Sequence, residues 1–330
     1  MTNYLPAFRY PTTVVIVDDN PDFLANVGLQ LDPQLALRRF VSPYDGLVSI
    51  NGSPAADPPG RFFSSYRQRD DHKPGEHVIA LGLDGILKEV RNPNRFARMS
   101  VAVVDYAMPE INGLEFCAGI KDARIGKILL TGKADERVAV KAFNDGLINR
   151  FIRKQDPDAI QQLATAIAEL QRDYFTRLER TISEALAVGA YGFLRNPDFV
   201  LVVERLLQEK KIVEHYLVTR PQGLLMLDAS GNAWRLVVMD ENALRSQVEI
   251  AQDLDAPDEL IRQLASGQVV PYFWRSGGDY SPLDTDWPAN LHPAKTCGEL
   301  RYALVPSPPG IALDGLIPYA RFLDDIDAAA

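Results

Sequence analysis

The chain has 330 residues, 46% of them hydrophobic and 24% charged, and a formal net charge of −9. These values are typical of soluble globular proteins, so they exclude a disordered, collagen-like or low-complexity chain, and the length favours two domains. The longest apolar stretches, Val14–Val17 and Phe199–Val203, are far shorter than the roughly 20 residues of a membrane helix. The first residues lack the apolar segment of a secretory signal. We therefore expect a cytoplasmic protein with no membrane partner.

Charge and cysteine content narrow the possible partners. Residues 1–187 carry 23 basic and 24 acidic residues, whereas residues 188–330 carry 12 and 20, a net charge of −8. Because non-specific DNA affinity comes mostly from Lys and Arg contacts to phosphates, this balance argues against nucleic acid as a partner of the C-terminal part. Cys117 and Cys297 are isolated, which argues against a zinc site and a disulfide framework.

Residues 1–155 alternate short β-branched runs with helical patterns, which is typical of a doubly wound, five-stranded parallel sheet. The predicted strands are Thr13–Val17, Ala36–Val41, Val101–Val104, Lys127–Leu130 and Arg150–Ile152. The predicted helices are Asp22–Gln30, Leu114–Ile120 and Asp135–Asn144.

An insertion at about residues 51–95 separates the second predicted strand from the third. Residues 51–78 are rich in Pro, Gly and polar residues, a composition that predicts loop. This segment is either a partner-binding insertion or a surface loop without a role of its own. A helix at Gly82–Val90 leads back into the sheet.

One long helix is predicted from Asp156 to about Ala187, within a connecting segment of residues 156–188. Its apolar residues recur at heptad-like spacing with one four-residue stutter: Ile160, Leu163, Ile167, Leu170, Tyr174, Leu178 and Ile182. An apolar stripe does not say whose surface it covers. The stripe either pairs two copies of the chain in a homodimer through 156–187 or packs on its own domain.

Residues 189–330 predict a separate α+β domain. A helix at Pro197–Lys210 precedes three strands, Glu214–Thr219, Leu224–Leu227 and Ala233–Met239, which are joined by turn sequences and should form an antiparallel sheet. Helices follow near Glu241–Ala251, Pro257–Ser266 and Leu316–Ile326. The segment Pro271–Pro309 gives no clear pattern.

Polar residues follow the predicted strands of the parallel sheet. Asp18 and Asp19 follow the first strand, Asp105 the third, Thr131 the fourth and Lys154 the fifth. Ligands bind outside the carboxyl ends of strands in open α/β sheets, so these side chains should converge. Clustered carboxylates suit Mg²⁺, and a Lys with a hydroxyl suits phosphoryl oxygens. The sequence therefore predicts phosphoryl transfer at a magnesium site.

These positions resemble the receiver domain of two-component response regulators. The matching segments are Val14–Asp19, Val103–Pro109 with Gly113 eight residues after Asp105, Leu129–Gly132 and Phe151–Lys154. The resemblance covers residues 12–187 and extends no further.

The resemblance implies a role for each matched residue. Asp105 would accept a phosphoryl group from a histidine kinase or phosphotransfer protein. Mg²⁺ would be bound by Asp19, Asp105 and the Ala107 carbonyl, with Asp18 acting mainly through water. Thr131 and Lys154 would contact the phosphoryl oxygens, and Phe151 would swing inward behind Thr131.

One residue beside the site departs from the family pattern. The family has a proline joined by a cis peptide after the lysine, where this chain has Gln155. A non-proline cis bond costs roughly 3–4 kcal/mol. Either that strain is kept, or the bond is trans and Lys154 is placed differently.

The C-terminal part matches no output domain that we identify. It lacks a basic helix-turn-helix, paired His-Asp motifs and a P-loop, and Ser276–Tyr280 lacks the acidic and Phe positions of a diguanylate cyclase motif. We expect a phosphorylation-controlled switch, not itself an enzyme, whose C-terminal domain binds a protein partner. The alternatives are an enzymatic or PAS-like ligand-sensing output and, third, a transcription factor.

Overall fold

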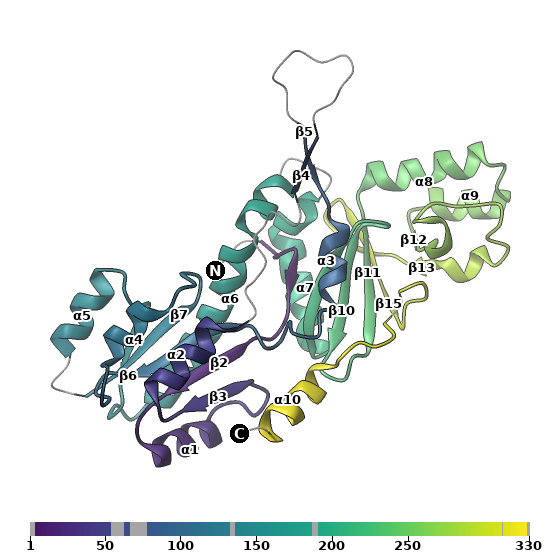
Figure 1. Cartoon of the computed structure of the whole chain (residues 1–330). Coiled ribbons are helices and arrows are strands. Elements are labelled where there is room, and N and C mark those ends of the chain that lie inside the picture. Colours follow the sequence, from purple (N-terminus) through teal and green to yellow (C-terminus); the bar gives the residue numbers. More distant parts are fainter. Residues whose placement is uncertain are drawn as a thin grey trace. The chain divides into compact units, whose positions relative to one another are not determined.

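The computed structural model describes residues 4–53, 63–66, 78–132, 136–186, 191–311 and 313–328. The chain divides into two compact units (Figure 1). The parallel-sheet unit comprises Pro11–Pro58, Pro93–Arg180 and Ala320–Ala330, and the antiparallel-sheet unit comprises Met1–Tyr10, Pro59–Asn92 and Thr181–Tyr319.

The parallel-sheet unit contains the five strands expected from the sequence, coloured purple to teal in Figure 1. All neighbouring strands are parallel, in the order β3-β2-β6-β7-β8. Their bounds are β2 Thr13–Val17, β3 Leu37–Phe40, β6 Met99–Asp105, β7 Gly126–Thr131 and β8 Arg150–Arg153. The predicted doubly wound α/β fold is confirmed.

The helices of this unit are α1 Pro21–Gln30, α2 Pro43–Asn51, α4 Gly113–Gly119, α5 Glu136–Asn144 and the long α6 Ala159–Leu186, with most of α10 Tyr319–Ala328. All except α2 were expected, although Asp135 at the predicted start of α5 lies outside the described residues. α2 was not predicted because its sequence contains Pro43 and Gly46, and both residue types disfavour the interior of a helix. Pro43 instead occupies the first turn, where a missing N–H costs nothing, and Ser42 caps the helix.

Two apolar layers cover the sheet, one on each face. Alternate residues of each strand point to opposite faces, so Val15 and Val17 lie in one layer and Val14 and Ile16 in the other. The first layer includes residues of α2, α4 and α5, and the second includes residues of α1 and α6. Cys117 lies in the first layer as a small apolar residue, and burial raises the pKa of its thiol to about 12.

The apolar stripe of α6 belongs to this second layer. Leu163, Ile167 and Leu170 are each 2% exposed and cluster with Ile128, Leu130 and Ile152 of the sheet. Of the two alternatives, packing on its own domain is therefore the one observed at these positions. A homodimer that pairs two copies across Leu163, Ile167 and Leu170 is wrong, because the sheet already covers them.

The antiparallel-sheet unit is built on six strands in the order β1-β9-β10-β11-β15-β14. Their bounds are β1 Phe8–Arg9, β9 Ile212–Val218, β10 Gly223–Asp228, β11 Ala233–Met239, β14 Lys295–Cys297 and β15 Leu300–Pro306. The predicted meander β9-β10-β11 is confirmed. β1 and β15 were not predicted. They pair with the two edge strands of this meander, β1 with β9 and β15 with β11.

Shorter elements complete this unit. Its α-helices are α3 Asp84–Glu89, α7 Pro197–Glu209, α8 Glu241–Asp253 and α9 Asp258–Ala265, all of them expected from the sequence. Among the described residues of this unit, the remaining strands are β12 Val269–Pro271, β13 Leu291–Pro293, β4 Phe63–Tyr66 and β5 Val78–Leu81, and 3₁₀ helices span Gly192–Arg195, Trp274–Ser276 and Trp287–Asn290.

The insertion and both ends of the chain differ from the boundaries expected at 1–155, 156–188 and 189–330. Much of the predicted loop, residues 54–62 and 67–77, lies outside the described residues. The rest is not all loop, because β4 and β5 pair as an antiparallel hairpin and α3 lies against β9. Residues 59–92 of the insertion and the first ten residues thus belong to the antiparallel-sheet unit, and residues 320–330 to the parallel-sheet unit.

None of the helices that the structure describes combines the length and the apolar character needed to span a membrane.

Candidate functional site

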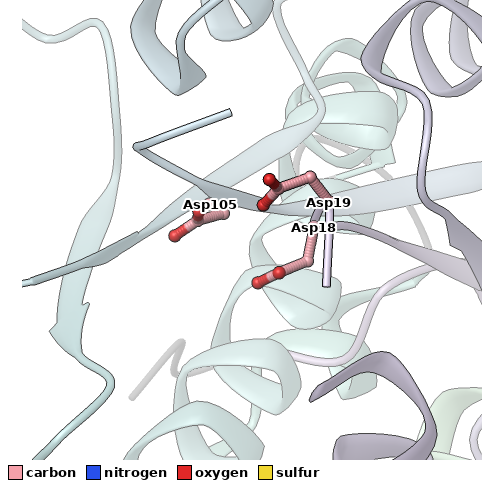
Figure 2. A group of neighbouring side chains, drawn as sticks. All are labelled: Asp18, Asp19 and Asp105. Carbon is pink, nitrogen blue, oxygen red and sulfur yellow. The ribbon is translucent and has the colours of Figure 1, made fainter. Parts of the chain in front are cut away.

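An acidic cluster lies at the carboxyl ends of β2 and β6. Asp18, Asp19 and Asp105 each offer a carboxylate oxygen within 4.8 Å of the others. Figure 2 shows these three side chains gathered together. Asp18 is fully buried, Asp105 is 6% exposed and Asp19 lies at the surface. The convergence follows from the topology, because β2 and β6 are parallel neighbours and their ends meet at one edge.

Lys154 reaches this cluster from the end of β8. Its Nζ lies 2.6 Å from Asp18 Oδ2 and 2.8 Å from Asp105 Oδ1. Burial lowers the pKa of Lys154, but the hydrogen bonds to Asp105 and Asp18 outweigh it and leave the pKa raised. Burial also raises the pKa of Asp18, against the opposing effect of Lys154. One ammonium group is therefore paired with two carboxylates at once.

The structure distinguishes between a cis and a trans peptide bond after Lys154, where Gln155 replaces the proline of the family. The one cis peptide among the described residues is Arg220–Pro221, so the Lys154–Gln155 bond is trans. Lys154 nevertheless contacts Asp105, and its N–H donates to the Thr131 carbonyl oxygen at 3.1 Å. Gln155 in place of proline leaves the ammonium group at the site.

Thr131 presents a hydroxyl without a partner. The residue is fully buried at the end of β7, and its Oγ1 makes no hydrogen bond. A buried hydroxyl of this kind costs about 1–3 kcal/mol, so it marks a position at which a polar ligand can be accepted. β7 is the neighbour of β6, and Leu130 pairs with Asp105.

The loop between β2 and α1 holds Asp18 in place. Asn20 caps α1 by accepting hydrogen bonds from the N–H groups of Asp22 and Phe23, at 3.0 and 3.1 Å. The Asn20 N–H in turn donates to Asp18 Oδ1 at 3.0 Å. Sequence analysis missed this support, although an Asn before Pro at a helix start is a recognisable capping signal.

Phe151 and Ala107 stand at the margin of the site. Phe151 is half-buried on β8, and its ring meets that of Phe143 edge-on, with ring centroids 6.3 Å apart. Ala107 lies exposed in the loop after β6. The roles that the resemblance implies for both depend on a metal ion and a phosphoryl group.

The donor set fits a hard divalent cation. All three side chains offer carboxylate oxygens, which Mg²⁺ prefers, and the cluster opens to solvent on the side of Asp19. Asp18, Asp19 and Asp105 are thus the described residues that can hold a metal here.

The solved structures include one relative that spans nearly the whole chain. The structure of the Legionella pneumophila response regulator LqsR is 36% identical, with a TM-score of 0.79, and the match covers 98% of this chain and 97% of that one. No protein-family model and no curated protein matches the sequence.

Two further structures match the chain in part. A response regulator receiver domain protein from Clostridium thermocellum is 20% identical, covers 49% of this chain and 94% of its own, and has a TM-score of 0.31. An adenylate cyclase from Rhodopirellula baltica is also 20% identical, covers 54% and 97%, and has a TM-score of 0.35. Neither partial match bears on function. Given the identity to LqsR over both chains, together with the receiver fold, this chain belongs to the response regulator family.

Proposed function

We propose that this response regulator accepts a phosphoryl group on Asp105 from the phosphohistidine of a histidine kinase or phosphotransfer protein. The observation that carries the proposal is the contact of Lys154 Nζ with Asp105 inside a cluster of three carboxylates. A carboxylate oxygen of Asp105 attacks phosphorus and the P–N bond to histidine breaks, and the histidine leaves as neutral imidazole because its other ring nitrogen already carries a proton. Such a kinase partner places the regulator in the cytoplasm.

We propose Mg²⁺ as the cofactor, bound by Asp19, Asp105 and the Ala107 carbonyl, with Asp18 acting mainly through water. Bound there, Mg²⁺ offsets the negative charge that builds up between carboxylate and phosphoryl oxygens. Lys154, which directly follows β8, contributes a second positive charge to the site. Its contacts to both buried carboxylates support this role.

Thr131 and Phe151 form the proposed switch. The unpartnered Thr131 hydroxyl gains a hydrogen bond when a phosphoryl oxygen arrives at the end of β6, which favours a small shift of the β7 end toward Asp105. Phe151, half-buried on the neighbouring strand β8, then moves inward behind Thr131. Phosphorylation thereby changes the surface of β8 and α5, where Phe143 meets Phe151.

The antiparallel-sheet unit is proposed to act as the output domain. We propose that it binds a protein partner, and that it neither binds DNA nor acts as an enzyme. The net charge of −8 in residues 188–330 does not suit nucleic acid, and this part of the sequence has no catalytic motif that we identify, which supports a protein partner.

A ligand-sensing output is the second candidate, because this unit carries a surface pocket of about 590 Å³. The size falls in the range of small-molecule sites. Arg301 and Glu299 line it with opposite charges, which suits a zwitterion, while the nearby Arg245 and Glu241 pair with each other at 3.5 Å. Free amino acids are the probes, titrated against wild type and Arg301→Ala while the fluorescence of Trp234, Trp274 and Trp287 is followed. Binding that Arg301→Ala weakens supports this candidate, and no binding removes it.

The phosphorylation proposal is tested with a small phosphodonor and Mg²⁺, followed by intact-mass measurement. Wild type should gain one phosphoryl group, and Asp105→Asn should gain none. Asp19→Asn should label slowly and bind Mg²⁺ weakly while keeping the fold. Asp45→Asn, an exposed aspartate in the first turn of α2, is the control and should label like wild type. Equal labelling of Asp105→Asn, or none in wild type, overturns the proposal.

A further inference from the structure

We propose that Phe23 is a positioning residue for Lys154, whose ring holds the ammonium group beside Asp105 while its other partners change. What Lys154 does for phosphorylation rests on the proposed function. Where Lys154 lies, and what holds it there, rests on the structure.

Three groups from three elements surround the ammonium group. Lys154 Nζ lies 4.4 Å from the centroid of the Phe23 ring, in addition to its contacts with Asp18 at 2.6 Å and Asp105 at 2.8 Å. A cation within about 6 Å of a ring centroid is attracted by the negative face of the ring. Phe23 is therefore the third partner of Lys154, and it comes from α1 rather than from a strand end.

The ring is well anchored for this role. Phe23 lies in the first turn of α1, is half-buried, and packs on the apolar layer that α1 and α6 share. Its backbone N–H is held by Asn20, whose own N–H is bound to Asp18. The ring and the Asp18 carboxylate are thus positioned by the same short loop, and both face Lys154.

The ring contact differs in kind from the two carboxylate contacts. Lys154 has three N–H donors on a flexible side chain, and each carboxylate takes one in a directed hydrogen bond. When Asp105 carries a phosphoryl group, the ammonium must exchange the carboxylate for a phosphoryl oxygen. A ring face attracts the cation without requiring a fixed N–H direction, so it keeps the ammonium in place during that exchange. Without it, Asp18 alone retains Lys154.

The test compares Phe23→Leu, which keeps apolar packing but removes the ring face, with Phe23→Tyr and Phe23→Trp, which keep it. A cation–π contact at a partly exposed site predicts a labelling rate about two- to five-fold lower in Phe23→Leu at saturating Mg²⁺. The Tyr and Trp variants should restore it. In a Lys154→Gln background, Phe23→Leu should cause no further loss, because the partner is gone.

The second readout is the NMR signal of the Lys154 ε-methylene group, assigned by its loss in Lys154→Gln. The ring should shift this signal upfield in wild type, and Phe23→Leu should abolish the shift. Phe322→Leu is the matched control. It removes a half-buried aromatic from α10 of the same unit, where the ring packs on Phe96, and should alter neither the signal nor the labelling rate.

The two readouts separate the two proposals. If the ε-methylene signal is the same in wild type and Phe23→Leu, the contact does not exist in solution and the inference is overturned. If that signal changes but the labelling rates are equal, Phe23 contacts Lys154 without positioning it, which also overturns the inference. If wild type fails to label, the proposed function fails, and the methylene signal still decides the contact.

Discussion

A β-carbon added to Gly113 would lie 2.4 Å from the carbonyl oxygen of Asp105. Gly113 is the first residue of α4, and its N–H donates to the Tyr106 carbonyl oxygen at 3.0 Å. The helix therefore begins directly against the backbone of the proposed phosphoacceptor. Only glycine permits so close an approach, which gives a physical reason for the glycine eight residues after Asp105.

Gly113→Ala should destabilise the parallel-sheet unit by about 1–3 kcal/mol, because the methyl group meets the Asp105 backbone carbonyl, which cannot yield cheaply, and also lies 2.8 Å from Leu129 Cδ1. Urea unfolding, followed by hydrogen exchange of β6 peptides, measures the loss. Gly192→Ala is the matched control, since a β-carbon there meets nothing within 4 Å. Equal stability of Gly113→Ala and wild type would contradict the close approach.

Thr131→Val should have opposite effects in two states. Without ligand, the variant should be as stable as wild type or up to about 1 kcal/mol more stable, because it removes a buried hydroxyl that has no partner. With Mg²⁺ and beryllofluoride, a phosphoryl mimic, it should gain less thermal stability than wild type. Thr131→Ser keeps the hydroxyl and should gain as wild type does. Destabilisation of the ligand-free Val variant by more than about 1 kcal/mol would mean that the hydroxyl is already bonded.

Ile167→Glu should unfold the parallel-sheet unit rather than split a dimer. Ile167 is 2% exposed between α6 and the sheet, so the carboxylate is buried without a counter-charge, at a cost of about 3–5 kcal/mol. Ala168→Glu places the same charge on the exposed side of the helix and should be tolerated. Hydrogen exchange of β7 peptides distinguishes the two. A folded, fully protected Ile167→Glu would show that this face of α6 is not in the core.

The antiparallel-sheet unit should lose stability on acidification through His215. Burial lowers the pKa of this imidazole to about 4 from 6.5, and its Nε2 lies 3.1 Å from the Pro6 carbonyl oxygen, to which it donates. Between these pH values His215 is protonated in the unfolded chain but neutral in the folded chain. Its full contribution to the free energy of unfolding is therefore present above pH 6.5 and is lost as the pH falls toward 4. The shift corresponds to about 3 kcal/mol.

His215→Gln keeps a donor for the Pro6 carbonyl and does not titrate, so its stability should fall less over that pH range. All three tryptophans, Trp234, Trp274 and Trp287, lie in this unit, so their fluorescence during thermal unfolding follows it specifically. Parallel pH profiles for wild type and His215→Gln would exclude His215 as the titrating group.

Local pattern was enough to predict the acidic cluster. The central strands β2, β6 and β7 are buried on both faces, so they appear in the sequence as short apolar runs, and each ends at a polar residue. Because parallel strands end at one edge, the run boundaries alone placed Asp18, Asp105 and Thr131 together. Lys154 followed from the same rule at β8.

Strand pairing between distant segments could not be predicted in this way. β15 pairs with β11 although it lies in a stretch without clear periodicity, and the two-residue β1 pairs with β9 across about 200 residues. Their hydrogen bonds come from neighbours in space, and those neighbours are not visible in a local pattern. The same limit applied to the α6 stripe, because its spacing fixed which side is apolar but not what covers it.

The sequence by itself determined which chemical groups meet at the edge of the parallel sheet, since strand ends and residue identity suffice for that. Tertiary structure alone decided how those groups are paired. It placed one ammonium between Asp18 and Asp105, set Phe23 beneath it, and left the Thr131 hydroxyl without a partner. These are matters of distance and burial, and both arise only when segments far apart in the sequence pack together.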